Sequence, residues 1–159
     1  MKQFLLNLAL VFLFPITICA QDSERNLSSE HWILTSTNTY NFKWLEAKVP
    51  GTVHTDLYRN KIIPNPFFGV NEKNLQWIEN EDWHYETLFT ISEKELKNEN
   101  CFLQFDGLDT YAEVWFNRTK ILTADNMFRT WKVDVKKLLV KGENQLRINF
   151  MSADRKSVV

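Results

Sequence analysis

Residues that are almost all apolar recur at every second position in five short runs over the second half of the chain. The runs are Trp83, Tyr85, Thr87, Phe89 and Ile91; Cys101, Leu103 and Phe105; Ala112, Val114 and Phe116; Trp131, Val133 and Val135; and Leu146, Ile148 and Phe150. Successive side chains of a β-strand point to opposite faces, so each run predicts a strand with one buried face. Five such strands separated by turn residues predict an all-β antiparallel sandwich or barrel.

The remaining segments predict further strands, short helical turns and tight turns. Strands are expected at 31–36 and 42–49, a short helix after Thr52, and single helical turns at 92–97 and 135–140. Turns are expected at Gly107, at Asn117-Arg118 and at 142–144, with Gly107 free to adopt a positive φ. In the 125–129 segment, Asn and Asp are expected to bond the local backbone while Phe128 points inward.

One irregular segment is unusually apolar. Between Ile62 and Gly69 the chain has two prolines and a glycine, which exclude a regular element, yet it also carries Phe67 and Phe68. An irregular segment normally lies at the surface, because buried backbone would lack hydrogen-bond partners. An exposed apolar loop usually marks an interface. We therefore expect the loop from Pro64 to Trp77 to contact a neighbouring domain.

Length and charge limit the classes of protein to be considered. The chain has 159 residues, which suits one domain with one core. Its formal net charge of −1 gives no basic excess, so a nucleic-acid partner is not expected. Apart from the N-terminal run, no segment approaches the roughly 18 apolar residues of a membrane span, so none is predicted.

The first twenty residues have the pattern of an export signal. Lys2 supplies a positive start, an apolar run follows from Phe4 to Phe14, and Ala20 offers a cleavage site. We predict a signal peptide at 1–20 and a periplasmic, extracellular or lysosome-like location, with Cys19 as an alternative lipidated residue. Residues 21–30 are polar and predict a flexible leader, and 31–159 form the sandwich domain, truncated at its C-terminus because 152–159 contain no closing strand.

No catalytic or metal-binding pattern is present. The sequence has no glycine-rich phosphate loop, no paired-cysteine metal site and no His-Glu-x-x-His. The three histidines, His31, His54 and His84, are spread along the chain and are expected to be structural. Cys101 is expected to be a small core residue. No catalytic, substrate-binding or metal-binding residue is therefore predicted, and no cofactor.

Two pairs of carboxylates are candidates for acid–base hydrolysis. They are Asp82 with Glu86 and Glu79 with Glu81. Near neighbours on a strand alternate faces, and the second pair lies in a polar loop, so neither pair is expected to work together.

Five segments in fixed order resemble the β-mannosidases of glycoside hydrolase family 2. They are Val49 to Leu57 (V-P-G-x-V-H-x-x-L), Ile63 to Glu72 followed by Leu75 to Ile78, Asp82 to Thr87 with its W-x-Y, Phe105 to Ala112, and Asp125 to Arg129. Together they cover most of 49–150. The resemblance implies a jelly-roll, galactose-binding-like sandwich that precedes immunoglobulin-like domains and a (β/α)₈ barrel.

The same resemblance implies an activity that this chain lacks on its own. Family members hydrolyse terminal β-mannosyl residues with retention, using two glutamates of the barrel about 5 Å apart. Those glutamates, and the family's mannose-binding W-D-W-G-P segment, do not occur in the sequence. The implied partners are the other domains of such an enzyme, contacted through the loop from Pro64 to Trp77, and mannose-containing glycans.

Three functions fit these features. The chain could be part of a β-mannosidase that is inactive by itself, a stand-alone secreted carbohydrate-binding module, or a structural domain that docks on a separate catalytic chain. A binding module would need an exposed aromatic platform, for which the candidates are Trp115, Trp131 and Tyr111. The alternation of side chains along the predicted strand, however, directs Trp131 inward.

Overall fold

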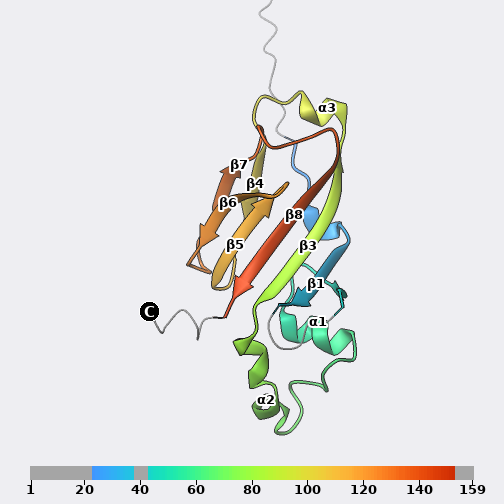
Figure 1. Ribbon diagram of the computed structural model, residues 1–159, viewed down its shortest axis with the longest axis vertical. Helices are drawn as coiled ribbons and strands as arrows, with labels where there is room; N and C mark the ends of the chain where they lie inside the picture. Colours follow the sequence, from blue (N-terminus) through green and yellow to red (C-terminus); the bar gives the residue numbers. More distant parts are fainter. Residues whose placement is uncertain (1–22, 38–42, 153–159) are drawn as a thin grey trace, which may run out of the picture.

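The computed structural model describes residues 23–37 and 43–152, which form two antiparallel sheets packed face to face. The strands are β1 (Trp32–Ser36), β2 (Leu45–Ala47), β3 (Trp83–Ile91), β4 (Phe102–Phe105), β5 (Tyr111–Phe116), β6 (Thr119–Ala124), β7 (Trp131–Asp134) and β8 (Gly142–Met151). A six-stranded sheet has the order β2-β1-β3-β8-β5-β6, and β4 pairs with β7 in a second sheet (Figure 1). The predicted antiparallel sandwich is confirmed.

Short helices connect the strands. They are η1 (Leu27–Ser29), α1 (Val53–Arg59), α2 (Asn71–Asn74), η2 (Gln76–Asn80) and α3 (Glu93–Leu96). The predicted helix after Thr52 is α1, where Thr52 and Thr55 form a reciprocal capping box. None of the helices in the described residues is long and apolar enough to cross a membrane.

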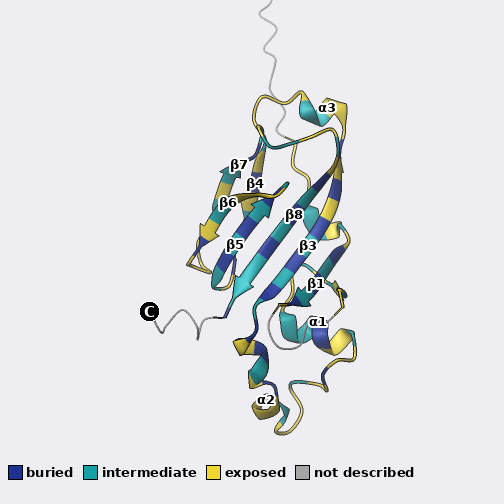
Figure 2. Cartoon of the chain, in the orientation of Figure 1, coloured by how far each residue is buried: buried dark blue, intermediate teal, exposed yellow. Residues whose placement is uncertain are grey.

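The core lies between the sheets, on the inner face of the larger sheet. Leu34, Val114 and Phe116 have no exposed surface, and the outward neighbours of these residues are half-buried (Figure 2). The inner face at the β5 end is covered by β4 and β7, and Leu57 of α1 joins the same core. The alternation read from the sequence therefore marks the buried face.

Strand β6 was not predicted, although a turn before it was. Its exposure pattern does not alternate strictly, because it is the last strand of the sheet. A two-residue turn joins β5 to β6, and its φ values are 46° at Asn117 and 68° at Arg118. Two positive φ values in succession are the mark of a type I′ turn, which suits the twist of paired strands.

Several sequence predictions were wrong in detail. Phe128 is 87% exposed, because its amide donates to Asn126 Oδ1 in a local turn that directs the ring away from the core. Gly107 has no positive φ; a Cβ there would instead meet the carbonyl oxygen of Met127 at 3.0 Å. Residues 142–144 begin β8 instead of forming a turn. By contrast, 135–140 contain the predicted single turn, in which the carbonyl of Val135 accepts from the amides of Leu138 and Leu139. The predicted strand at 42–49 is confined to β2, and Cys101 is half-buried.

The end of the expected leader carries defined contacts. Asn26 caps η1, the indole of Trp32 donates to the carbonyl of Leu27 at 2.9 Å, and Arg25 donates to the carbonyl of Thr90 at 2.7 Å. These contacts attach residues 25–30 to the sheet. The predicted signal peptide at 1–20 and the residues from 153 onward lie outside the described ranges.

Candidate functional site

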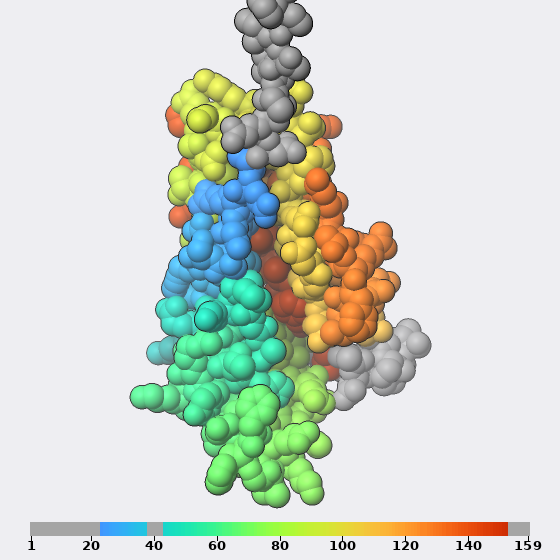
Figure 3. Space-filling view, turned by 180° about the vertical axis from the view of Figure 1, so that it is seen from behind, coloured from blue at the N-terminus to red at the C-terminus, as the bar shows by residue number. Residues whose placement is uncertain are grey.

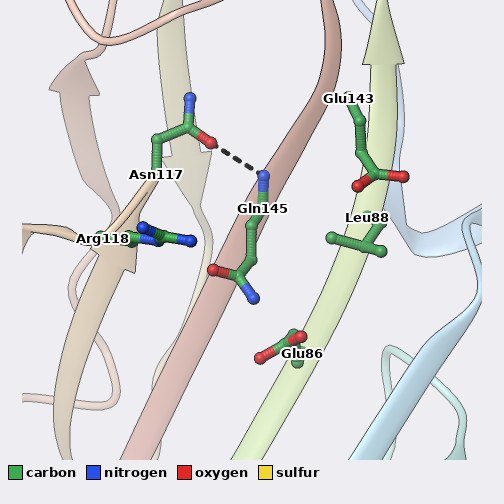
Figure 4. Close-up of a pocket in the computed structure, with 6 residues that line it drawn as sticks. All are labelled: Glu86, Leu88, Asn117, Arg118, Glu143 and Gln145. Carbon is green, nitrogen blue, oxygen red and sulfur yellow. Dashed lines mark hydrogen bonds between the residues drawn. The ribbon is translucent and has the colours of Figure 1, made fainter.

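An open hollow lies on the outer face of the larger sheet, over β3, β8 and the β5–β6 turn. Its volume is about 330 Å³, and it is lined by Glu86, Leu88, Asn117, Arg118, Glu143 and Gln145 (Figure 4). A second hollow of about 450 Å³ shares Arg118 and Gln145 and adds Trp115 and Arg147. We call the two together the outer hollow.

An ion pair forms part of the floor of the outer hollow. Arg147 donates from Nε at 3.0 Å and from one terminal nitrogen at 2.8 Å to the same oxygen of Glu86. The two residues lie directly opposite each other in the β3–β8 pairing. The side chain of Glu86 is only 13% exposed, so the arginine holds it as a paired carboxylate.

A network of two asparagines holds one rim of the hollow. Asn117 Oδ1 accepts from the amide of Gln145 at 2.9 Å, as Figure 4 shows. The side-chain nitrogen of Asn117 donates to Asn144 Oδ1 at 2.8 Å, and the side-chain nitrogen of Asn144 in turn donates to the carbonyl of Val140. Asn144 is buried, and its contacts fix the hairpin that carries Arg118 over the hollow.

Two buried polar atoms on this face have no hydrogen-bond partner among the described residues. They are the indole nitrogen of Trp115 and the Oδ1 atom of Asn149. Buried polar atoms are usually paired, so these two atoms are exceptions on a face whose other polar groups are hydrogen-bonded.

His84 lies on the same face, opposite Asn149 in the β3–β8 pairing. Burial lowers the pKa of His84 below its usual value, and the positive charge of Arg147 lowers it further, against the smaller opposing effects of Asp82 and Glu86. His84 is therefore neutral at pH 7, which suits a structural role.

Two carboxylates, Glu86 and Glu143, line the outer hollow. Glu86 is held in an ion pair with Arg147, which lies directly opposite it in the β3–β8 pairing. A carboxylate held by an arginine is poorly suited to act as the general acid of a glycosidase, whose pKa must be raised. The described residues also contain no group of three potential metal ligands.

Several of the candidate carboxylates and histidines have structural partners. Asp82 Oδ1 accepts from the amide of Ser152 at 2.7 Å, and His31 bonds to Glu46 at 3.2 Å. His54 lies half-buried on α1. None of these side chains joins the others in a cluster.

The apolar loop is a second candidate surface. Phe67, Phe68 and Val70 are 89%, 75% and 67% exposed, and we call them the loop patch. The buried side chains of Ile63 and Leu75 anchor the two ends of the segment. The loop is thus an ordered surface element that presents apolar side chains, as the sequence predicted.

Ahead of α2, side-chain hydrogen bonds replace regular structure in this loop. Asn65 Oδ1 accepts from the amide of Phe67 at 3.0 Å, and the carbonyl of Asn65 accepts from the side chain of Asn71 at 2.9 Å. The aromatic candidates from the sequence lie elsewhere. Trp115 borders the outer hollow, and Trp131 packs against the core with the Arg129 guanidinium 4.1 Å from its ring centre.

The sheet order and the one-sided core define a galactose-binding-like β-sandwich domain. A family model described as "Glycosyl hydrolase 2 galactose-binding domain-like" matches residues 32–158. The chain belongs to this family.

Several β-mannosidases are similar to the chain over most of its length. The probable beta-mannosidase of Caenorhabditis elegans is 38% identical over 105 residues, and the beta-mannosidase of Rattus norvegicus is 39% identical over 109. These alignments cover 66% and 69% of this chain but 12% of each relative. The chain thus spans about an eighth of the length of these relatives.

Solved structures agree with this result. The beta-D-mannosidase of Dictyoglomus thermophilum superimposes with a TM-score of 0.75 at 43% identity, over 79% of this chain and 15% of that one. An exo-chitosanase of Amycolatopsis orientalis superimposes with a TM-score of 0.66 at 19% identity, over 77% and 16%, which shows a shared fold alone.

Proposed function

We propose that this chain is the N-terminal accessory domain of a retaining β-mannosidase that hydrolyses terminal β-D-mannosyl residues. The observation that carries the proposal is the 43% identity to the Dictyoglomus thermophilum beta-D-mannosidase over 79% of the chain. The match covers 15% of that enzyme, and the Glu86 carboxylate of the outer hollow is already paired with Arg147. The chain alone is therefore expected to be inactive, with hydrolysis carried out by the other domains.

A domain exchange tests this proposal. Residues 31–152 replace the matching segment of the Dictyoglomus thermophilum enzyme, and release of nitrophenol from a β-mannoside is measured. We expect the chimera to keep activity within about tenfold of the parent, and the isolated chain to release none. The control chimera carries the matching segment of the 19% identical exo-chitosanase and should be much less active. A folded but inactive chimera, or an active isolated chain, contradicts the proposal.

A specific observation favours sugar binding as a second candidate function. Trp115 borders a hollow that also holds Arg118, Gln145 and Arg147, and its indole nitrogen is unpaired. Sugar sites combine an aromatic face with a few hydrogen-bonding groups. Titration calorimetry of the chain with mannobiose tests this function, with Trp115→Ala as the variant that should lose binding. Lack of heat with the parent chain excludes a stand-alone module for this sugar.

We also propose that the protein is exported, on the basis of the charged start and apolar run within residues 1–20. N-terminal sequencing of the product from a secreting host tests the proposal. The expected first residue is Gln21. Retention of Met1, or a lipidated Cys19, contradicts cleavage after Ala20.

A further inference from the structure

The second part of the outer hollow differs in charge from the first. It is lined by Trp115, Arg118, Gln145 and Arg147, and none of these side chains is a carboxylate. The first part, by contrast, is lined by acidic as well as basic groups. The second part therefore presents two guanidinium groups, an amide and an indole ring, and we call it the arginine hollow.

Strand pairing places the floor of the arginine hollow in one row across the larger sheet. Trp115 of β5 lies directly opposite Arg147 of β8, and Arg147 lies opposite Glu86 of β3. Gln145 is two residues before Arg147 on β8, so its side chain points to the same face. The amide of Asn117 donates to the carbonyl of Gln145 at 3.0 Å, which fixes the start of the β5–β6 turn beside this row.

Arg118 reaches the arginine hollow from that turn. Its φ of 68° belongs to the type I′ turn, which the side chain of Asn117 anchors to Asn144 on β8. The side chain of Arg118 extends over the sheet toward Gln145 (Figure 4). Arg118 is exposed and forms no hydrogen bond or ion pair with the described residues. Its positive charge is therefore available to a ligand.

Arg147 keeps hydrogen-bond donors for a ligand in spite of its ion pair. A guanidinium group has five N–H groups, and Arg147 uses its Nε and one terminal nitrogen to contact a single oxygen of Glu86. The side chain of Arg147 is 40% exposed, whereas that of Glu86 is 13% exposed. Glu86 balances the charge of Arg147, so Arg118 gives the hollow its net positive charge and Arg147 adds directed donors.

A ligand that uses all of these groups has one carboxylate and one apolar face. The planar fork of a guanidinium group matches a carboxylate, and hydrogen bonds between the two charged groups are stronger than neutral ones. The half-buried ring of Trp115 offers a flat apolar surface to a sugar ring beside them. The volume of about 450 Å³ lies within the range of about 300 to 1,000 Å³ that small-ligand sites have.

We propose that the arginine hollow binds an acidic sugar, whose carboxylate lies between Arg118 and Arg147 and whose ring lies against Trp115. The side chain of Gln145 bonds a hydroxyl group of the same sugar. This inference rests on the second candidate function, sugar binding at the outer hollow, and it gives that function a ligand class. A neutral sugar leaves Arg118 without a partner and binds more weakly.

An acidic peptide is a poorer ligand than an acidic sugar. The adjoining part of the outer hollow is lined by Glu143, which is exposed and forms no hydrogen bond or ion pair with the described residues. Its negative charge repels a second carboxylate of a peptide whose first carboxylate lies on Arg118. A ligand with a single carboxylate at the arginine hollow avoids this repulsion.

Calorimetric titration of the unmodified chain with two matched disaccharides tests the proposal. Mannobiose and the equivalent disaccharide of mannuronic acid differ in the carboxylates that replace primary hydroxyl groups. We expect the acidic disaccharide to bind at least about fivefold more tightly, and its affinity to fall when salt is raised from about 0.05 M to about 0.5 M. Equal affinities for the two disaccharides overturn the proposal. Acetate that binds as tightly as the acidic disaccharide also overturns it, because the sugar ring would then contribute nothing.

Two charge-matched variants test the role of Arg118. Arg118→Gln should keep the melting temperature, because Arg118 is exposed and unpaired, and should weaken binding of the acidic disaccharide by at least about fivefold. Lys132→Gln removes the same charge from an exposed position on the smaller sheet and should bind like the parent chain. An unchanged affinity in Arg118→Gln, or an equal loss in both variants, overturns the proposal.

The indole N–H signals in NMR spectra of the parent chain locate the ligand without any substitution. The signal of Trp115 should shift when the acidic disaccharide is added. The signal of Trp131, which packs against the core from the smaller sheet, should not shift. A shift of the Trp131 signal alone would place the sugar elsewhere and overturn the proposal, even if Arg118→Gln failed to fold.

The remaining outcomes separate this inference from the proposed functions. Heat with the acidic disaccharide alone supports the inference and excludes mannobiose as the ligand. Heat with neither disaccharide overturns the inference together with sugar binding at the outer hollow, whereas the domain exchange still decides the role in a β-mannosidase. Tighter binding of a short glutamate peptide than of the acidic disaccharide would mean a protein ligand, and would overturn the proposed ligand class.

Discussion

The phenol of Tyr85 on β3 donates a hydrogen bond of 3.1 Å to the carboxylate of Asp56 on α1, 29 positions earlier in the chain. Asp56 has no exposed surface, and its other oxygen accepts from the amide of Lys48 at 3.0 Å and from Arg59 at 2.7 Å. Burial raises the pKa of Tyr85, and the charge of Asp56 raises it further, so the phenol stays a donor at neutral pH. This bond ties the helix to the inner face of the sheet.

Removing the phenol oxygen should destabilise the domain. Tyr85→Phe deprives a buried carboxylate of one donor, and hydrogen bonds to charged groups contribute about 1.5 to 3 kcal/mol. We expect the free energy of unfolding in urea to fall by about 2 kcal/mol. Tyr58→Phe is the control, because Tyr58 is 49% exposed and should change stability by less than about 0.5 kcal/mol. Equal unfolding midpoints for the two variants would show that the bond contributes little.

Substitution in the loop patch should change solubility more than stability. Phe68 is 75% exposed, so Phe68→Ser should raise the solubility limit and alter stability by less than about 0.5 kcal/mol. Ile63→Ser, at the buried base of the same segment, should cost about 3 kcal/mol or more because it empties a core position and buries a hydroxyl. Solubility and urea unfolding are measured for both. If Phe68→Ser unfolds the domain, the loop belongs to the core.

Two glycines should respond differently to alanine. At Gly51 a Cβ would lie 2.3 Å from the carbonyl oxygen of Lys48, a contact that requires the backbone to move. Gly51→Ala should therefore cost about 2 kcal/mol or more. Gly69 has a φ of 62° and nothing near its Cβ position, so Gly69→Ala should cost only about 1 kcal/mol for the left-handed backbone. Thermal unfolding that ranks Gly69→Ala as the more damaging variant would refute the close approach at Gly51.

His84 should make the domain less stable in mild acid. Burial lowers its pKa in the folded state below the usual 6.5, so the unfolded chain binds the proton more readily. The stability that depends on neutral His84 is fully present above pH 6.5, and it is lost as the pH falls from 6.5 through the lowered pKa of the folded state. The difference in unfolding free energy between the parent and His84→Gln should therefore shift in favour of the variant from pH 7 to pH 5. His31→Gln, on an exposed histidine paired with Glu46, is the control. A constant difference for His84→Gln across this range would contradict the prediction.

Much of the fold could be read from local patterns. The alternation around Tyr85, Val114 and Ile148 marked three central strands, because a strand with one buried face imposes period two on its sequence. The Thr52 cap and the proline-rich loop were equally local. Strand β6 was missed because an edge strand is partly exposed on both faces and keeps no clear alternation.

The sequence by itself determined the sandwich class, the family resemblance and the exposed loop patch, because each depends on residues close together in the chain. Only the tertiary structure showed the contact of Asp56 with Tyr85 and the Glu86–Arg147 pair beside Trp115. These features join segments tens of residues apart. Strand order and register bring them together, and no local pattern encodes which strands become neighbours.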